Sequence, residues 1–211
     1  MCGTRFAERA GVDAIKVALP YPFIPTDAMV LEYVRRVTGA STLPFLVESS
    51  DELQVSIPVI AALCADPRFV GMEEMGTSLG HLQTMHREFA GRLALLPAGE
   101  TALLMLCLLG APGCLAAENN VAPVFMGEFL EACKRRDIDR ALALFDRRTQ
   151  YRDLFRAGLH RQSFTPWTKA AMELLGLPVG KPRPPHEQLT AAERALLRNA
   201  LATQFGLTPV C

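Results

Sequence analysis

The sequence predicts an α/β fold in which parallel strands alternate with helices along the first half of the chain. Short apolar, β-compatible runs alternate with longer segments of helical spacing from residue 13 to residue 118. Turn and capping residues separate these runs. After residue 118 the strand-like runs cease and only helical segments follow. Such alternation is typical of a parallel sheet built from βα units.

Five runs are predicted to be strands, and four helical segments are predicted between them. The helix after the first run has Thr26 as its expected N-cap, and the next has Ser56 as cap with Pro58 in its first turn. The predicted strands are residues 13–20, 43–48, 68–73, 92–99 and 113–118, and the helices between them are 27–39, 56–65, 78–91 and 100–110. Four further helices are expected at 121–135, 137–157, 165–176 and 190–205.

The number of βα units predicts a partial barrel of the (β/α)8 TIM type. A closed barrel needs eight strands and commonly about 250 residues. We expect residues 1–135 to form the last five βα units and residues 136–211 to form a C-terminal helical region packed on the barrel. The first eleven residues resemble the end of a helix. We therefore expect the three preceding units to be absent through truncation, domain loss or an incomplete gene model.

Composition limits the class of protein. The 211 residues carry 22 basic and 22 acidic side chains, which gives no basic footprint for nucleic acid. Six cysteines lack a CxxC pair and are expected to be reduced core residues in a cytoplasmic protein. The longest apolar segment is broken at residues 110–113 and is too short for a bilayer span. No secretory signal is evident.

Several stretches, in this order, resemble the dihydrodipicolinate synthase and N-acetylneuraminate lyase family. They are AGVDAIKVALPYPFIPT at 10–26, PRFVGMEEMGTSL at 67–79, LPAGETALL at 96–104 and GAPGCLAAENNVAP at 110–123. The resemblance continues into the C-terminal helices. It implies a (β/α)8 barrel that joins a lysine to pyruvate or another 2-oxo acid as an imine, then makes or cleaves a bond as a lyase or aldolase. It also implies a dimer or tetramer without a cofactor.

The same resemblance places unusual residues at the positions that carry the family's chemistry. Glu73 stands where the family has its imine-forming lysine, and a carboxylate cannot condense with a ketone. Glu48 lies near the position of a proton-relaying tyrosine, while Tyr21 is the best-retained pocket residue. Ordinary imine catalysis is therefore expected to be blocked at residue 73. The resemblance further assigns ligand-binding positions to Thr26, Gly99, Glu100 and Leu115.

Carboxylates are expected to gather where the predicted strands end. Like charges at one edge of a sheet repel unless a cation neutralises them. Three cations could neutralise them: a divalent metal, which would also stabilise an enolate; a cationic substrate; or Lys16. Alternatively, Glu74, Glu100 and Glu118 cap the helices that follow them. The candidate metal ligands are Glu48, Glu73, Glu100 and Glu118.

Lys16 has two possible orientations within its apolar strand. Pointing inward, it could pair with a carboxylate or act as a relocated imine lysine; pointing outward, it would extend between helices toward solvent. His81 and His86 are five residues apart, which does not place them on one helix face, and both are expected at the surface. Lys169 is expected to have a structural role.

Three functions remain open at this point. The chain could be a lyase or aldolase with altered machinery. It could be a non-catalytic descendant that binds a metabolite or associates with other subunits. It could also be a fragment without independent function.

Overall fold

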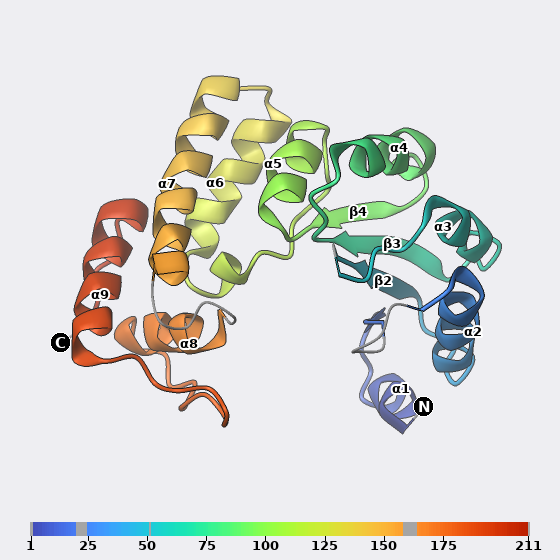
Figure 1. Ribbon diagram of the computed structural model, residues 1–211, viewed down its shortest axis with the longest axis horizontal. Coiled ribbons are helices and arrows are strands. Elements are labelled where there is room, and N and C mark those ends of the chain that lie inside the picture. Colours follow the sequence, from blue (N-terminus) through green and yellow to red (C-terminus); the bar gives the residue numbers. More distant parts are fainter. Residues whose placement is uncertain (1, 20–24, 51, 158–163, 211) are drawn as a thin grey trace. The chain divides into compact units, whose positions relative to one another are not determined.

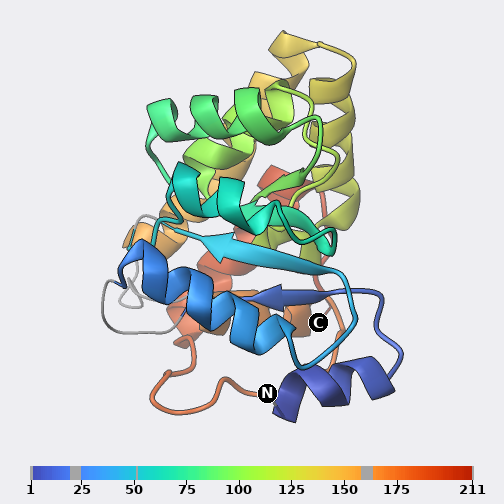
Figure 2. The same cartoon turned by 90° about the vertical axis from the view of Figure 1, so that its right-hand side faces the viewer.

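A parallel β-sheet organises the first half of the chain. Its strands pair in the order β1, β2, β3, β4, and every neighbouring pair is parallel. Figure 2 shows β1 and β2 pointing in the same direction. The strands of the described residues are β1 (Ile15–Val17), β2 (Phe45–Ser49), β3 (Phe69–Glu74) and β4 (Ala94–Pro97).

The structure is a computed structural model that describes residues 2–19, 25–50, 52–157 and 164–210. The chain divides into two compact units, Met1–Ala116 and Ala117–Cys211. The first unit contains the sheet, and the described part of the second contains helices and the segments that connect them (Figure 1).

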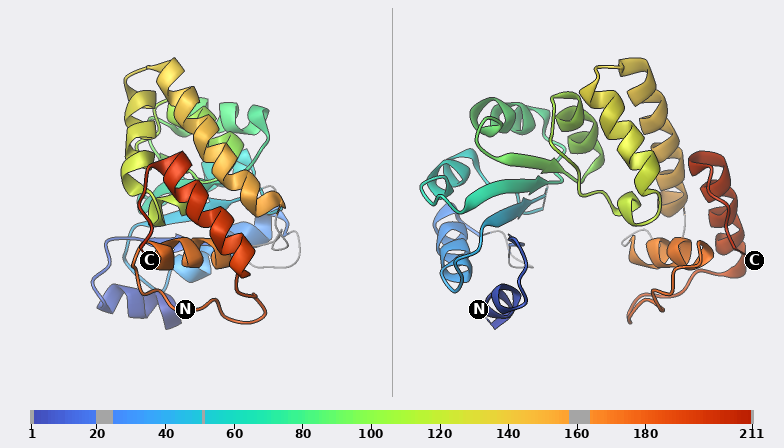
Figure 3. Two further views of the ribbon diagram at one scale, coloured as in Figure 1. Left: turned by 90° about the vertical axis from the view of Figure 1, so that its left-hand side faces the viewer. Right: turned by 180° about the vertical axis from the view of Figure 1, so that it is seen from behind.

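Each strand of the first unit is followed by a helix. Thr26 and Ser56 cap α2 and α3 as predicted, because their side-chain oxygens accept hydrogen bonds from Met29 and Val59. Helices α2, α3 and α4 lie side by side on one face of the sheet (Figures 1 and 3). The helices are α1 (Cys2–Arg9), α2 (Asp27–Thr38), α3 (Ile57–Leu63), α4 (Leu79–Phe89) and α5 (Glu100–Leu108).

Strand alternation separates the side chains into two sets. One set faces the helices and forms the sheet's contribution to the core; it comprises Val17, Val47, Met72 and Leu95, all buried. The other set projects from the opposite face and comprises Lys16, Leu46, Glu48, Gly71, Glu73, Ala94 and Leu96. The charged residues of the strands therefore occupy this second face, apart from Glu74.

One irregularity interrupts the alternation in β3. Phe45 pairs with Phe69, but the next residue of β2, Leu46, pairs with Gly71. Val70 is the extra residue at this bulge, and the aromatic rings of Phe45 and Phe69 stack beside it with centroids 5.4 Å apart. The bulge fixes which face every later residue of β3 occupies.

The fifth predicted strand, residues 113–118, is absent from the described structure. The Leu115 N–H donates to the Pro97 carbonyl at 3.0 Å, which extends the pairing of β4 by a single hydrogen bond. The chain then turns, because the Glu118 carbonyl accepts from the N–H groups of Val121 and Ala122. The 3-10 helix η1 (Ala117–Asn120) stands in place of a strand end.

Four α-helices follow η1 in the described part of the second unit, close to their predicted ranges. They are α6 (Pro123–Lys134), α7 (Ile138–Ala157), α8 (Thr165–Leu174) and α9 (Ala191–Phe205). Helix α7 packs against α6 and α9 around Tyr151, Leu144 and Phe129. The predicted boundary after residue 135 assigned α6 to the barrel, whereas α6 belongs to the compact unit that begins at Ala117.

Within the described ranges, none of the helices combines the length and hydropathy that a membrane span requires.

Lys169 has the structural role expected for it, since its Nζ donates to the carbonyl oxygens of Val179, Gly180 and Lys181.

Gly99, the N-cap of α5, provides a test of the packing between neighbouring strand ends. A Cβ at this position would lie 2.3 Å from the Met75 carbonyl oxygen, so the backbone must shift to accept one. We expect Gly99→Ala to lower the free energy of unfolding by about 1–3 kcal/mol in denaturant titrations. Gly80→Ala is the matched control, since a Cβ at Gly80 meets open space in α4. Equal stability of the two variants would contradict this account.

Candidate functional site

The Lys16 side chain lies between two glutamates from neighbouring strands. Its Nζ is 2.7 Å from Glu48 Oε2 on β2 and donates a hydrogen bond to Glu73 Oε2 on β3. The side chains of Lys16, Glu48 and Glu73 are 43%, 26% and 8% exposed. We call these three residues the Lys16 cluster. The inward orientation of Lys16 holds, and the alternative in which it extends between helices is wrong.

The two carboxylates determine the charge state of Lys16. Partial burial by itself lowers the pKa of the Lys16 ammonium, but hydrogen bonds and charge attraction from Glu48 and Glu73 outweigh burial and raise the pKa. The resting side chain is therefore an ammonium group. The cluster contains one positive and two negative side chains, so it can hold a proton, move it between nitrogen and oxygen, and present an amine.

The consecutive residues Glu73 and Glu74 point to opposite faces of the sheet. Glu74 is completely buried and its Oε1 accepts a hydrogen bond of 2.6 Å from the Gly76 N–H. Its other oxygen lies 3.8 Å from Nε2 of His81. Glu74 thus fixes the loop after β3, and does not share a site with Glu73.

His81 lies against the sheet and is only 10% exposed, so the prediction of a surface position is wrong. Burial lowers the pKa of its imidazole. The signal that could have located it is the capping pattern, because Ser78 caps α4 by accepting from the His81 N–H and so places His81 in the first turn, close to the end of β3. The ring of His86 lies 3.2 Å from the Leu109 carbonyl oxygen.

The predicted ligand-binding positions have local structural roles. Thr26 caps α2, Gly99 caps α5, and Glu100 is the first residue of α5. Leu115 is 43% exposed and its backbone extends the pairing of β4. Tyr21, the predicted pocket tyrosine, lies outside the described residues.

Glu118 is neutralised by arginines of α7. Its two oxygens lie 3.3 Å from Arg148 Nη2 and 3.1 Å from Arg152 Nη1, and the side chains of Glu118 and Arg148 are only 2% and 1% exposed. Glu118 also lies in the first turn of η1, where the capping alternative expects an acidic residue. The arginines are four residues apart on α7, and this spacing could have indicated a shared face.

The predicted metal site used Glu48, Glu73, Glu100 and Glu118. Two of these carboxylates contact Lys16, and Glu118 contacts two arginines of the second unit. Over the described ranges, His, Cys, Asp and Glu side chains form no group of three or more that could hold a metal ion. Within the Lys16 cluster, the ammonium group of Lys16 offsets part of the negative charge of Glu48 and Glu73.

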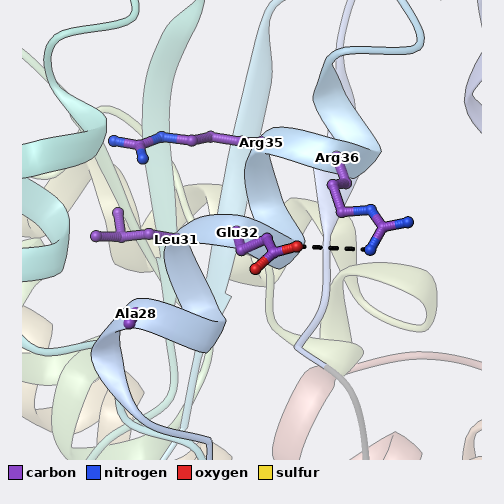
Figure 4. A pocket seen from close by; sticks show the side chains of 5 residues that line it. All are labelled: Ala28, Leu31, Glu32, Arg35 and Arg36. Atoms are coloured by element: carbon purple, nitrogen blue, oxygen red, sulfur yellow. Dashed lines mark ion pairs between the residues drawn. The ribbon is translucent and has the colours of Figure 1, made fainter.

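A shallow hollow on α2 is the surface feature drawn in Figure 4. Glu32 and Arg36 form an ion pair of 3.5 Å there, with both side chains largely exposed. All lining residues come from one helix: Ala28, Leu31, Glu32, Arg35 and Arg36. An exposed i,i+4 pair of this kind stabilises a helix surface slightly, which is a sufficient role for it.

Parallel strands that each lead into a helix, with titratable side chains near the strand ends, define a protein of the (β/α) barrel class. The chain belongs to the dihydrodipicolinate synthetase family, whose model matches residues 3–204. The family and the fold predicted from the sequence are thus confirmed.

Individual relatives agree with this assignment. The 4-hydroxy-tetrahydrodipicolinate synthase of Methanopyrus kandleri is 30% identical over 212 residues, covering 97% of this chain and 68% of that protein. Two solved structures share the fold. Dihydrodipicolinate synthase of Acinetobacter baumannii, complexed with pyruvate, has a TM-score of 0.82 at 23% identity, covering 97% and 69% of the two chains. N-acetylneuraminate lyase of Fusobacterium nucleatum has a TM-score of 0.82 at 14% identity, covering 96% and 68%.

Removal of the Lys16 amine tests the charge balance of the cluster. We expect Lys16→Met to lower the free energy of unfolding at pH 7 by about 1–3 kcal/mol, between the values for exposed and buried ion pairs, because two carboxylates lose their shared cation. Lys134→Met is the control. Lys134 is 42% exposed and pairs with the exposed Glu131, so its loss should cost less than about 1 kcal/mol.

The pH dependence of the same variant follows from the direction of the Lys16 shift. The pKa of Lys16 is raised in the folded state, so its charged form stabilises the fold. This stabilisation is fully present below the pKa of the unfolded chain, about 10.4, and is lost as the pH rises through the pKa of the folded chain. The difference in stability between wild type and Lys16→Met should therefore stay constant from pH 7 to about pH 10 and shrink above it. A constant difference beyond that pH would show that Lys16 does not titrate as this contact requires.

Because the Glu118 ion pair is buried, we predict that breaking it lowers the stability of the second unit strongly. We expect Arg148→Met to cost about 3–5 kcal/mol, because it leaves a buried carboxylate with less positive charge. Arg140→Met lies on the same helix and is the control, since Arg140 pairs with Glu128 at 3.0 Å with both side chains about half exposed. It should cost less than about 1 kcal/mol in the same denaturant titration.

Proposed function

We propose that this protein is a lyase or aldolase that acts on pyruvate or another 2-oxo acid. Its family membership supports the reaction class, and the relative that was solved with pyruvate supports the substrate class. The chain spans 68% of the length of the Methanopyrus protein. That this shorter chain has the activity of the whole relative is therefore part of the proposal.

The observation that carries the proposal is the Lys16 cluster. It offers a protonated amine and two carboxylates from three adjacent strands, on the sheet face opposite the helices. Groups of this kind can polarise a carbonyl and accept a proton from the carbon beside it. Since Glu73 occupies the position that the resemblance gives to lysine, no imine forms at residue 73, and activation of the substrate uses other groups.

A second candidate function is non-catalytic binding of a 2-oxo acid, or association with other subunits. The contacts of Lys16 favour it, because an ammonium group held between two carboxylates can donate hydrogen bonds to a ligand but is not a nucleophile while it keeps its proton. A dimer or tetramer, as the family resemblance implies, is compatible with either function.

Hydrogen exchange at C3 of pyruvate tests the proposal without knowledge of the second substrate. A lyase or aldolase of this class must remove a proton from C3 or break the bond to it. In deuterium oxide the wild-type chain should therefore introduce deuterium into the pyruvate methyl group faster than buffer does, as followed by proton NMR. Lactate, which lacks the ketone, should show no exchange.

Binding measured in parallel separates the two candidates. Pyruvate at about one hundred times its dissociation constant should stabilise the chain by about 2.7 kcal/mol. Binding without exchange would support the non-catalytic function, and absence of both would reject the proposal. Exchange that stops with a chelator and returns with magnesium would assign the activation to a metal-bound enolate.

A further inference from the structure

We propose that Lys16 is the amine that forms an imine with the 2-oxo acid, and that Glu73 accepts its proton. This inference rests on the function proposed above and names the groups that would perform it. The family resemblance expects a lysine at residue 73, where this chain has a glutamate. In the cluster the nitrogen of Lys16, which comes from a different strand, contacts the Glu73 carboxylate.

The distribution of lysines singles out Lys16. The sequence contains four lysines, and Lys16 is the only one before residue 134. Lys134 forms an exposed pair with Glu131, and Lys169 donates to three carbonyl oxygens. Lys181 is exposed in the segment before α9. Among the lysines, Lys16 alone projects from the sheet into a cluster of carboxylates.

The geometry explains how a lysine on β1 can supply an amine beside residue 73. Neighbouring strands lie about 4.8 Å apart, so β1 and β3 are separated by roughly twice that distance. Lys16 and Glu73 project from the same face and extend toward each other across β2. Their side chains together cover the separation. The nitrogen therefore reaches the family's reactive position from two strands away.

The charges around Lys16 provide the proton transfers that imine formation needs. Glu73 is 8% exposed and in direct contact with Nζ, while the more exposed Glu48 lies at 2.7 Å. Transfer of a proton from Nζ to Glu73 yields a neutral amine and a carboxylic acid. This form carries as many protons as the ion pair, so it requires no base from solvent. The amine becomes a nucleophile as a carbonyl carbon approaches.

The complete step balances within the cluster and the substrate. The nitrogen lone pair attacks C2 of the 2-oxo acid, and the ketone oxygen takes the proton from Glu73 to form a carbinolamine. Glu73 accepts a second proton from nitrogen and returns it to the hydroxyl, which leaves as water. The product is a protonated imine with one proton left on nitrogen. Two protons of the original ammonium depart with the ketone oxygen, and no oxidant or reductant is required.

The protonated imine draws electrons from C3, which is the property a lyase or aldolase uses. Glu48 remains a carboxylate beside the new cation and stabilises its charge. Because the cluster has two carboxylates and the substrate brings a third, the site favours a small 2-oxo acid with one negative charge over a dianionic one.

Borohydride trapping tests this assignment. The full chain is incubated with pyruvate, treated with sodium borohydride and analysed by peptide mass spectrometry, with pyruvate alone and borohydride alone as blanks. Reduction adds hydride to the imine carbon and leaves a stable secondary amine. We expect the adduct on Lys16, its retention in Lys134→Met, and its loss in Lys16→Arg. Lys16→Arg keeps a cation between Glu48 and Glu73, so circular dichroism should show a folded chain.

The outcomes distinguish this inference from the function on which it rests. Loss of both the adduct and the C3 exchange in folded Lys16→Arg supports the assignment. Exchange that persists in Lys16→Arg, or an adduct on another lysine, overturns the role of Lys16 but leaves the proposed function standing. Wild-type protein that neither binds pyruvate nor exchanges C3 rejects both.

Glu73→Gln tests the role of the carboxylate separately. The amide preserves shape but cannot accept the ammonium proton, so trapping on Lys16 should slow by about 100-fold, within the usual range for general acid–base catalysis. The remaining rate should increase with pH, because hydroxide or solvent must then remove the proton. An unchanged rate and pH profile would show that Glu73 only holds Lys16 in place.

Discussion

The contact of one ammonium group with two carboxylates is the interaction on which the proposed chemistry depends. Glu48 and Glu73 are aligned across neighbouring strands, so their charges would repel without Lys16 between them. The contact joins three strands on the face of the sheet opposite α2, α3 and α4. It therefore serves stability and places an amine near the strand ends at the same time.

Side-chain alternation makes this contact possible and keeps it separate from the core. Val17, Val47 and Met72 fill the layer under the helices, while their sequence neighbours Lys16, Glu48 and Glu73 project the other way. A charged cluster can thus be tolerated within strands that also build an apolar core. Glu74 is the exception on the helix side, and it is satisfied there by the loop that follows β3.

The sequence was sufficient to predict the order of the elements and the family, because these depend on apolar runs, helix caps and motif order. Thr26 and Ser56 are examples, since each cap is visible in the sequence and present in the structure. The orientation of Lys16 could not be predicted, because parity along a three-residue strand has too little pattern to decide it. The strand expected at residues 113–118 is absent, and this could not be predicted for a different reason. The arginine partners of Glu118 come thirty or more residues later in the chain, so no local pattern shows them.

The bulge at Val70 has an evolutionary consequence. Phe69 and Gly71 would lie on the same face of a regular strand, but the extra residue reverses the parity, so that Glu73 and not Glu74 meets Lys16. The adjacent residues Glu73 and Glu74 thus lie on opposite faces, Glu73 in the Lys16 cluster and Glu74 on the side of the helices. An insertion or deletion of a single codon near Val70 could exchange the faces of the sheet that the two glutamates occupy. No point substitution at either glutamate could do so.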